Sequence, residues 1–195
     1  MSTKAEATPG TVQAGSGHSS DYGVATAPGT LRLERLLPGP IERVWTYLTD
    51  SASRGEWLAA GEMELREGGR VDLTFHHADL SAEQTVPEQY KAHAGDSRCN
   101  GRILRCEPPR LLSFTWIEGQ AEPSQVTFEL TPRGDGVLLV LTHSRLPNRG
   151  EMVSIASGWH AHLGILADRL APRAPRPFWS TLLQAEAEYE RRLPA

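Results

Sequence analysis

The chain has 195 residues with a formal net charge of −4 and 39% hydrophobic residues, a length that suits one domain with tails. Charges of both signs are interspersed and the longest basic run is Arg191-Arg192, so we expect neither nucleic acid nor an anionic membrane as a partner. No apolar run approaches the roughly 20 residues of a membrane span. The two cysteines have no CxxC spacing, which favours a reducing compartment. We therefore expect a soluble cytoplasmic protein.

The chain begins with a polar stretch over residues 1–28, rich in Ser, Thr, Gly and Ala and almost free of large apolar side chains. Such a segment cannot bury enough surface to offset its ordering entropy, so we expect a disordered N-terminal tail. From Thr30 the pattern changes. Leu31 and Leu33 alternate with charged residues, which predicts a half-buried strand that ends at Pro38-Gly39-Pro40.

Two short helices are expected next. Proline suits the first helical turn, and the apolar residues Ile41, Val44, Trp45 and Leu48 then recur at helical spacing. Ser53 and Glu56 have the spacing of a capping box, which predicts a second helix over residues 53–58 with Trp57 and Leu58 at its buried end.

About six strands follow, because short apolar runs recur along the chain. Apolar and polar residues alternate in most of them, but the inward set of residues 101–107 cannot be assigned, and residues 137–141 are apolar on both faces, as in a more central strand. The runs are residues 62–65, 71–75, 101–107, 112–116, 126–130 and 137–141. Short turn-rich connections imply antiparallel pairing. Residues 75–98 are longer than a hairpin requires, and such loops are often lids or disordered.

A long helix is predicted over Met152–Leu170. Large apolar residues recur there at steps of three and four on one stripe, while Ser157, Ala161, Gly164 and Asp168 fall on the far side. Three prolines then break the chain, and residues 178–193 carry a further apolar stripe. We expect a terminal helix packed on the domain or on a partner subunit. The domain boundaries are therefore 1–28 for the tail, 29–171 for the folded domain and 172–195 for the proline-rich linker and extra helix.

An antiparallel sheet closed by one long helix is a two-layer α+β domain. The run from Gly101 through Pro108-Pro109 to Trp116 resembles the G-x-I/V-L/V … P-P-x-x-L-x-F/Y-x-W signature of the Hsp90-ATPase-activator-homologue-like family, part of the START-like (SRPBCC) helix-grip superfamily. Gly68-Gly69 and Gly158-Trp159 agree with it. The resemblance implies a bacterial protein with a curved antiparallel sheet of six or seven strands around the C-terminal helix, and two short helices after the first strand.

Histidines are the candidate chemical groups. His160 and His162 lie about 200° apart around a helix and cannot converge on one ion, so we expect no metal site, and nothing in the sequence implies a cofactor. His143 and His162 lie beside apolar stripes. They are either an acid and base facing the space between helix and sheet, or hydrogen-bonded histidines at the margin of the core.

Aromatic and aliphatic side chains on the inner faces are the candidate ligand contacts, with Trp116 and Trp159 the strongest of them. The predicted ligand-binding residues are Trp45, Trp57, Phe75, Phe114, Trp116, Phe128, Ile155, Trp159, His162, Leu163 and Leu166.

The predicted function is the binding of a small hydrophobic or aromatic molecule between the long helix and the sheet, without catalysis. No nucleophile elbow, Walker motif or dinucleotide fingerprint is present. The resemblance keeps two alternatives open. One is a cyclase- or aromatase-like enzyme with His143 and His162 as acid and base, and the other is a regulator of an Hsp90-type chaperone ATPase. We also expect a homodimer.

Overall fold

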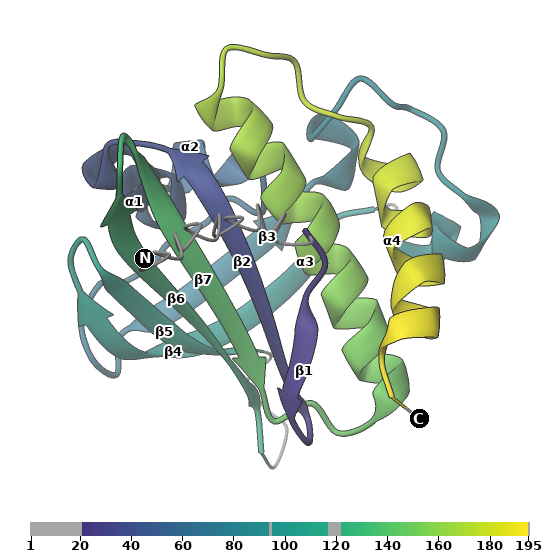
Figure 1. Cartoon of the computed structure of the whole chain (residues 1–195), viewed down its shortest axis with the longest axis horizontal. Coiled ribbons are helices and arrows are strands. Elements are labelled where there is room, and N and C mark those ends of the chain that lie inside the picture. Colours follow the sequence, from purple (N-terminus) through teal and green to yellow (C-terminus); the bar gives the residue numbers. More distant parts are fainter. Residues whose placement is uncertain (1–20, 94, 117–121, 195) are drawn as a thin grey trace, which may run out of the picture.

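The structure is a computed structural model that describes residues 21–93, 95–116 and 122–194. Its described part forms one antiparallel sheet of seven strands in the order β1-β2-β7-β6-β5-β4-β3, together with four α-helices (Figure 1). The elements are β1 (Val24–Ala27), β2 (Thr30–Pro38), α1 (Ile41–Thr49), α2 (Ser51–Gly55), β3 (Arg70–Phe75), the short 3-10 helices η1 (His77–Asp79) and η2 (Glu88–His93), β4 (Ser97–Glu107), β5 (Leu111–Trp116), β6 (Ser124–Arg133), β7 (Gly136–Ser144), α3 (Arg149–Leu170) and α4 (Phe178–Arg192).

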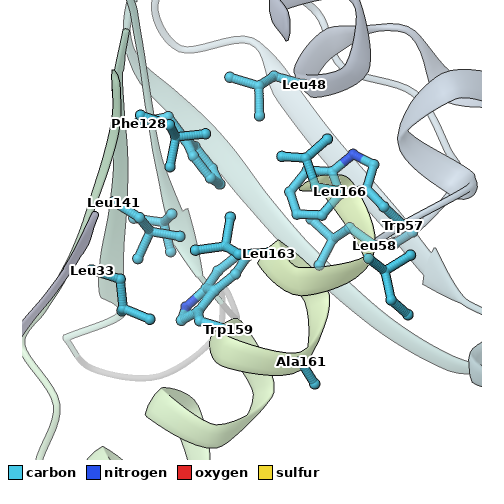
Figure 2. Packing of buried hydrophobic residues seen from close by; sticks show 14 of the residues in the cluster. Leu33, Leu48, Trp57, Leu58, Phe128, Leu141, Trp159, Ala161, Leu163 and Leu166 are labelled. Carbon is cyan, nitrogen blue, oxygen red and sulfur yellow. The ribbon is translucent and has the colours of Figure 1, made fainter. Parts of the chain in front are cut away.

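The sheet curves around α3, and α4 lies along the side of α3 that faces away from the sheet (Figure 1). This is the α+β helix-grip arrangement that the sequence predicted. The alternation of β2, β6 and β7 sends side chains such as Leu33, Phe128 and Leu141 toward α3, where they meet Leu163 and Leu166 (Figure 2). A single apolar core therefore fills most of the space between helix and sheet.

The helix α3 begins at Arg149, and the Asn148 side chain caps it by accepting a 2.9 Å hydrogen bond from the backbone N–H of Glu151. Its far side was predicted to carry only small or polar residues. Ser157, Ala161 and Asp168 are nevertheless buried, because α4 packs along α3 and the linker before α4 covers Asp168 through Arg173 and Arg176. The helix is therefore buried on two sides.

Part of the range predicted to be a tail is folded. The first 20 residues of that range lie outside the described residues, but Val24–Ala27 form the edge strand β1 within the range assigned to the tail. The composition of this segment does not indicate a strand, because β1 is held by backbone pairing with β2 and its side chains are mostly exposed. A second contact is the hydrogen bond that the backbone N–H of Gly23 donates to the Tyr189 hydroxyl, 2.7 Å away.

Two local predictions need correction, and the predicted strand over residues 101–107 is confirmed as part of β4. The cap of α2 is Asp50, whose carboxylate accepts from the Ser53 N–H, so the helix begins before the predicted capping box. Residues 62–65 make only an isolated bridge from Met63 to Val71, and no strand. In β4 the register shifts between Ile103 and Arg105, so the inward-facing set changes parity along the strand and no single alternation appears in the sequence.

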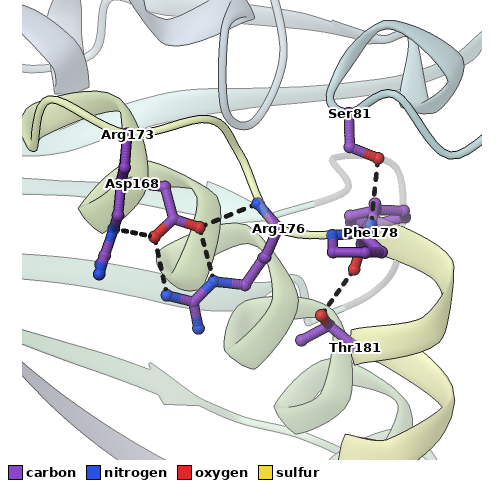
Figure 3. A network of polar contacts seen from close by, with 7 residues as sticks. Ser81, Asp168, Arg173, Arg176, Phe178 and Thr181 are labelled. Carbon is purple, nitrogen blue, oxygen red and sulfur yellow. Dashed lines mark hydrogen bonds and ion pairs between the residues drawn. The ribbon is translucent and has the colours of Figure 1, made fainter.

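The long connection from Phe75 to Arg98 is attached to the start of α4. The backbone N–H of Phe178 donates a 3.1 Å hydrogen bond to the Ser81 hydroxyl (Figure 3), and the Ser180 N–H donates to the Glu83 carboxylate. In the described part of the chain, no helix is long and apolar enough to cross a membrane.

Candidate functional site

A cavity of about 380 Å³ lies between α3 and the edge of the sheet formed by β3, β4 and β5. Its wall is mostly apolar, with a few polar groups at one side. The lining residues are Leu58, Phe75, His77, Ser97, Arg98, Cys99, Trp116, Ser154, Ile155, Gly158, Trp159 and His162.

The topology brings these residues together because β3 and β5 end, and β4 begins, at the same end of the sheet. Phe75 ends β3 and pairs with Ser97 at the start of β4, while Trp116 ends β5 on the other side of β4. The facing wall comes from α3, where Ser154, Gly158 and His162 recur every four residues and so share one side of the helix.

His162 gives this wall a defined hydrogen-bond acceptor. Its Nδ1 lies 2.7 Å from the carbonyl oxygen of Trp57, and because a carbonyl only accepts, Nδ1 carries the proton. Burial, with a smaller contribution from nearby His77, lowers the pKa of His162 to about 3, so the ring is neutral at pH 7. Nε2 then keeps its lone pair and has no hydrogen-bond partner among the described residues. It is not sealed from solvent, and His162 lines the cavity.

His143 is placed differently, in the core and outside the wall of the cavity. The indole N–H of Trp159 donates to its Nδ1 at 3.0 Å, so Nε2 carries the proton and donates to the Ser124 hydroxyl at 2.9 Å. Burial lowers the pKa of His143 to about 3. Its two ring nitrogens are thus occupied, and its contact with Trp159 orients a residue of the cavity wall.

The structure brings five of the eleven predicted ligand-binding residues to the cavity: Phe75, Trp116, Ile155, Trp159 and His162. The other six lie elsewhere, since inward alternation does not distinguish packed core from cavity wall. Trp45 is half-buried on α1, and the rest belong to the core: Trp57, Phe114, Phe128, Leu163 and Leu166. Ligand contact at any of the eleven remains a prediction.

Sequence reasoning missed the polar part of the wall, which includes Ser97, Arg98 and Ser154. The spacing of Ser154, Gly158 and His162 was a usable signal, because small or polar residues four apart interrupt an apolar helix face. Ser97 and Arg98 gave no such signal. They lie at the end of the long connection, and the sequence did not predict where the next strand begins.

A second cavity of about 280 Å³ adjoins the first and is covered by α4 and the 75–98 connection. The two share His77, Ser154, Gly158 and His162, while Phe178, Trp179, Leu182 and Tyr90 complete the second. The His77 ring stacks on Phe178 with centroids 5.1 Å apart and lies 5.6 Å from His162. These two imidazoles form the boundary between the cavities.

The other candidate chemistry does not converge within residues 21–93, 95–116 and 122–194. No group of three His, Cys, Asp or Glu side chains is arranged to hold a metal ion there. His160 points away from His162, toward the ring of Tyr22 at 4.5 Å. Cys99 and Cys106, both among the described residues, are not joined in a disulfide.

Comparisons with known proteins agree with this geometry. A solution NMR structure of a Bordetella parapertussis protein is 48% identical, with 90% of this chain and 92% of that chain covered and a TM-score of 0.76. The crystal structure of CalU16 from Micromonospora echinospora is 25% identical, with 83% and 86% covered and a TM-score of 0.61. The Aha1 dimer from Colwellia psychrerythraea is 13% identical, with 72% and 95% covered and a TM-score of 0.56, a likeness of fold alone.

A search of curated proteins finds no match. The sequence profile of the family described as "Activator of Hsp90 ATPase homolog 1-like protein" matches residues 38–171, nearly the whole of the region from Leu31 to Leu170 that resembles it. The match includes β3, β4, β5 and α3, the elements that form most of the wall of the cavity of about 380 Å³. The chain therefore belongs to the Activator of Hsp90 ATPase homolog 1-like family.

Proposed function

We propose that the protein binds a small hydrophobic or aromatic molecule in the cavity between α3 and the β3–β5 edge, without transforming it. The observation that carries this proposal is an apolar cavity of about 380 Å³ with a small number of convergent polar groups. Binding sites for small molecules have this size and composition. The apolar wall supplies affinity, and the polar groups select the orientation of the ligand.

The polar groups also indicate what the ligand carries. Nε2 of His162 is a fixed acceptor in an apolar wall formed by Phe75, Trp116 and Trp159. A hydroxyl or N–H group of a ligand would donate to this acceptor, and in an apolar surrounding such a hydrogen bond is stronger than in water. An aromatic ring with one such donor, as in a phenol, matches this wall.

Gly158 allows a direct test, because it lies on α3 facing the cavity and a Cβ built there meets no heavy atom within 4 Å. Gly158→Leu should fill part of the cavity without a clash and, since leucine is the better helix former, without loss of stability. Gly158→Ala is the matched control, because it makes the same backbone change and leaves most of the volume open.

The measurements are native mass spectrometry of each protein as purified, and thermal unfolding with 1-naphthol and with octanoate. A ligand that binds only the folded state raises the unfolding temperature. We expect a rise for the wild type and for Gly158→Ala, and none for Gly158→Leu. If Gly158→Leu responds as the wild type does, or if no probe or co-purified molecule binds the wild type, the proposal is wrong.

The two alternative functions have weaker support. A cyclase- or aromatase-like reaction was expected to use His143 and His162 together. His143 does not line the cavity, and its two ring nitrogens are hydrogen-bonded to Trp159 and Ser124. Regulation of an Hsp90-type ATPase rests on the description of the family. A pulldown that recovers the chaperone near physiological salt would favour it over ligand binding.

A homodimer is also proposed, and the relative from Colwellia psychrerythraea, described as a dimer, is its only support. Sedimentation equilibrium over a concentration series tests it, and a constant monomer mass would refute it. Cytoplasmic location stays a prediction from the composition.

A further inference from the structure

A third cavity lies on another part of the molecule, at the edge of the sheet beside β2. β1 pairs with β2 from Thr30 to Arg32, and among the described residues no strand pairs with this side of β2 from Glu34 to Leu36. A cavity of about 470 Å³ fills the space between this edge, α3 and the linker that precedes α4. Its lining residues are Asp21, Glu34, Arg35, Leu36, Arg133, Leu138, Gly164, Ala167, Arg173 and Arg176.

Arg35 is the unexpected member of this cavity. It occupies an inward-facing position of β2, between Leu33 and Leu37, and only 8% of it is exposed. Charged side chains are rarely buried so deeply without a partner, because the desolvation of a cation is costly.

The guanidinium of Arg35 has few partners within the described chain. Nη1 donates to the carbonyl oxygen of Glu34 at 2.8 Å, and no carboxylate lies within ion-pair distance. No nitrogen of this side chain is both sealed from solvent and unbonded, so the remaining N–H groups open on the cavity. Asp21 lines the same cavity and acts on Arg35 only over a longer distance.

The opposite wall adds more positive charge. Gly164 has no side chain, and the Arg176 guanidinium packs there, 2.9–3.0 Å from where a Cβ would lie. Asp168 accepts hydrogen bonds from Arg176 at 2.7 and 3.0 Å and also pairs with Arg173 at 2.6 Å, so one carboxylate serves two arginines (Figure 3). Arg133 stands at the rim.

The charges around the cavity do not balance. Four arginines line it, against Asp21 and Glu34 in the lining and Asp168 behind Arg173 and Arg176, and Glu34 is already paired with Arg32. Burial lowers the pKa of Arg35, and the opposing charge interactions with Asp21 and Tyr189 do not offset this effect. An anion in the cavity would supply the missing charge and accept from the open N–H groups.

We infer that this cavity binds a small oxyanion, a phosphate or carboxylate group, through the buried guanidinium of Arg35 with Arg176 and Arg133 around it. The fork of N–H donors in arginine matches the oxygens of either group. This site lies apart from the proposed hydrophobic cavity and shares none of its lining residues.

The test compares thermal unfolding of the full chain in sodium phosphate, sodium acetate and sodium chloride at equal ionic strength. We expect phosphate or acetate to raise the unfolding temperature of the wild type above the chloride value, with saturation. The anion that saturates at the lower concentration identifies the preferred group. Equal unfolding temperatures in all three salts would overturn the inference.

Arg35→Met keeps the apolar stem and removes the charge. In chloride it should be at least as stable as the wild type, because replacing an unpaired buried charge by an apolar group is often stabilising. It should lose the saturable response, whereas Arg110→Met, at an exposed position outside the cavity, should keep it. A saturable response retained by Arg35→Met would mean general salt stabilisation and would refute the site.

Arg133→Met is a second variant, and it changes no buried residue. The residue is exposed at the rim, so its removal should leave the fold intact. We expect the phosphate or acetate concentration at half-saturation to rise severalfold. An unchanged half-saturation in Arg133→Met, together with failure of Arg35→Met to fold, would count against the site.

Discussion

The indole N–H of Trp159 on α3 donates a 3.0 Å hydrogen bond to Nδ1 of His143 on β7. Because an indole can only donate, this bond fixes the tautomer of His143 and directs its Nε2–H to Ser124. The chain of three groups attaches the gripping helix to the centre of the sheet, next to the cavity that Trp159 lines. A polar connection in the core thus positions one wall of the proposed binding site.

Trp159→Phe should lower the free energy of unfolding by about 1–3 kcal/mol beyond the effect of a smaller ring, because it leaves a buried acceptor of His143 without a donor. Urea unfolding at pH 7.5 measures the change. Trp45→Phe is the control, since Trp45 is only half-buried and its indole makes no such bond to a histidine. Equal losses in the two variants would mean that the bond contributes no net stability.

Stability should fall as the pH is lowered from 7 to 5. Burial lowers the pKa of His143 and His162 to about 3 and that of His160 to about 4, below the usual value near 6.5. The unfolded chain therefore binds more protons than the folded chain in this range. The stabilisation is fully present above pH 6.5 and is lost as the pH falls, by up to about 1.4 kcal/mol per pH unit for each group.

His143→Asn checks this origin, because its carboxamide oxygen can still accept from Trp159 but does not titrate. The variant should be less stable at pH 7.5 and show a shallower loss toward pH 5, as measured by urea unfolding at several pH values. Trp45→Phe, which removes no titratable group, should keep the wild-type slope. The same slope in all three proteins would rule out His143 as a source.

Two glycines of α3 should respond in opposite directions to the same substitution. Gly158→Ala should stabilise the protein by up to about 1 kcal/mol, because it adds helix propensity in open space. Gly164→Ala should destabilise it, because the new methyl group meets the Arg176 guanidinium, which Asp168 holds in place. Differential scanning calorimetry at pH 7.5 measures the unfolding temperature of each variant. A change in the same direction for both variants would contradict the packing described.

Asp168→Asn should lower the unfolding free energy by roughly 1–3 kcal/mol, a range reduced for the partial exposure of its arginine partners. Burial by itself would raise the pKa of Asp168, but hydrogen bonds from Arg176 and the charges of Arg176 and Arg173 hold it below the usual range. The asparagine side chain lacks the negative charge that holds Arg173 and Arg176 of the linker against α3. Asp72→Asn, on an exposed strand position, is the control for urea unfolding, and a loss as large there would remove the special role of Asp168.

Much of the fold could be predicted because periodicity reports which face of an element is apolar. The spacing of Val44 and Leu48 predicted α1, and the alternation of Val126, Phe128 and Leu130 predicted β6. β1 escaped prediction, since an edge strand held by backbone hydrogen bonds leaves no apolar pattern. Arg35 was overlooked as well, although a charge among the inward-facing leucines of β2 is a readable signal.

The sequence by itself determined the α+β class, the long gripping helix and the apolar inner faces, because these follow from the local order of apolar and polar residues. Only the tertiary structure decided which inward-facing residues line a cavity and which pack against other side chains in the core. Phe114 and Trp116 share a strand face, yet Trp116 lines the cavity and Phe114 is buried in the core. That difference depends on sheet curvature and on neighbours distant in the sequence, so no local pattern encodes it.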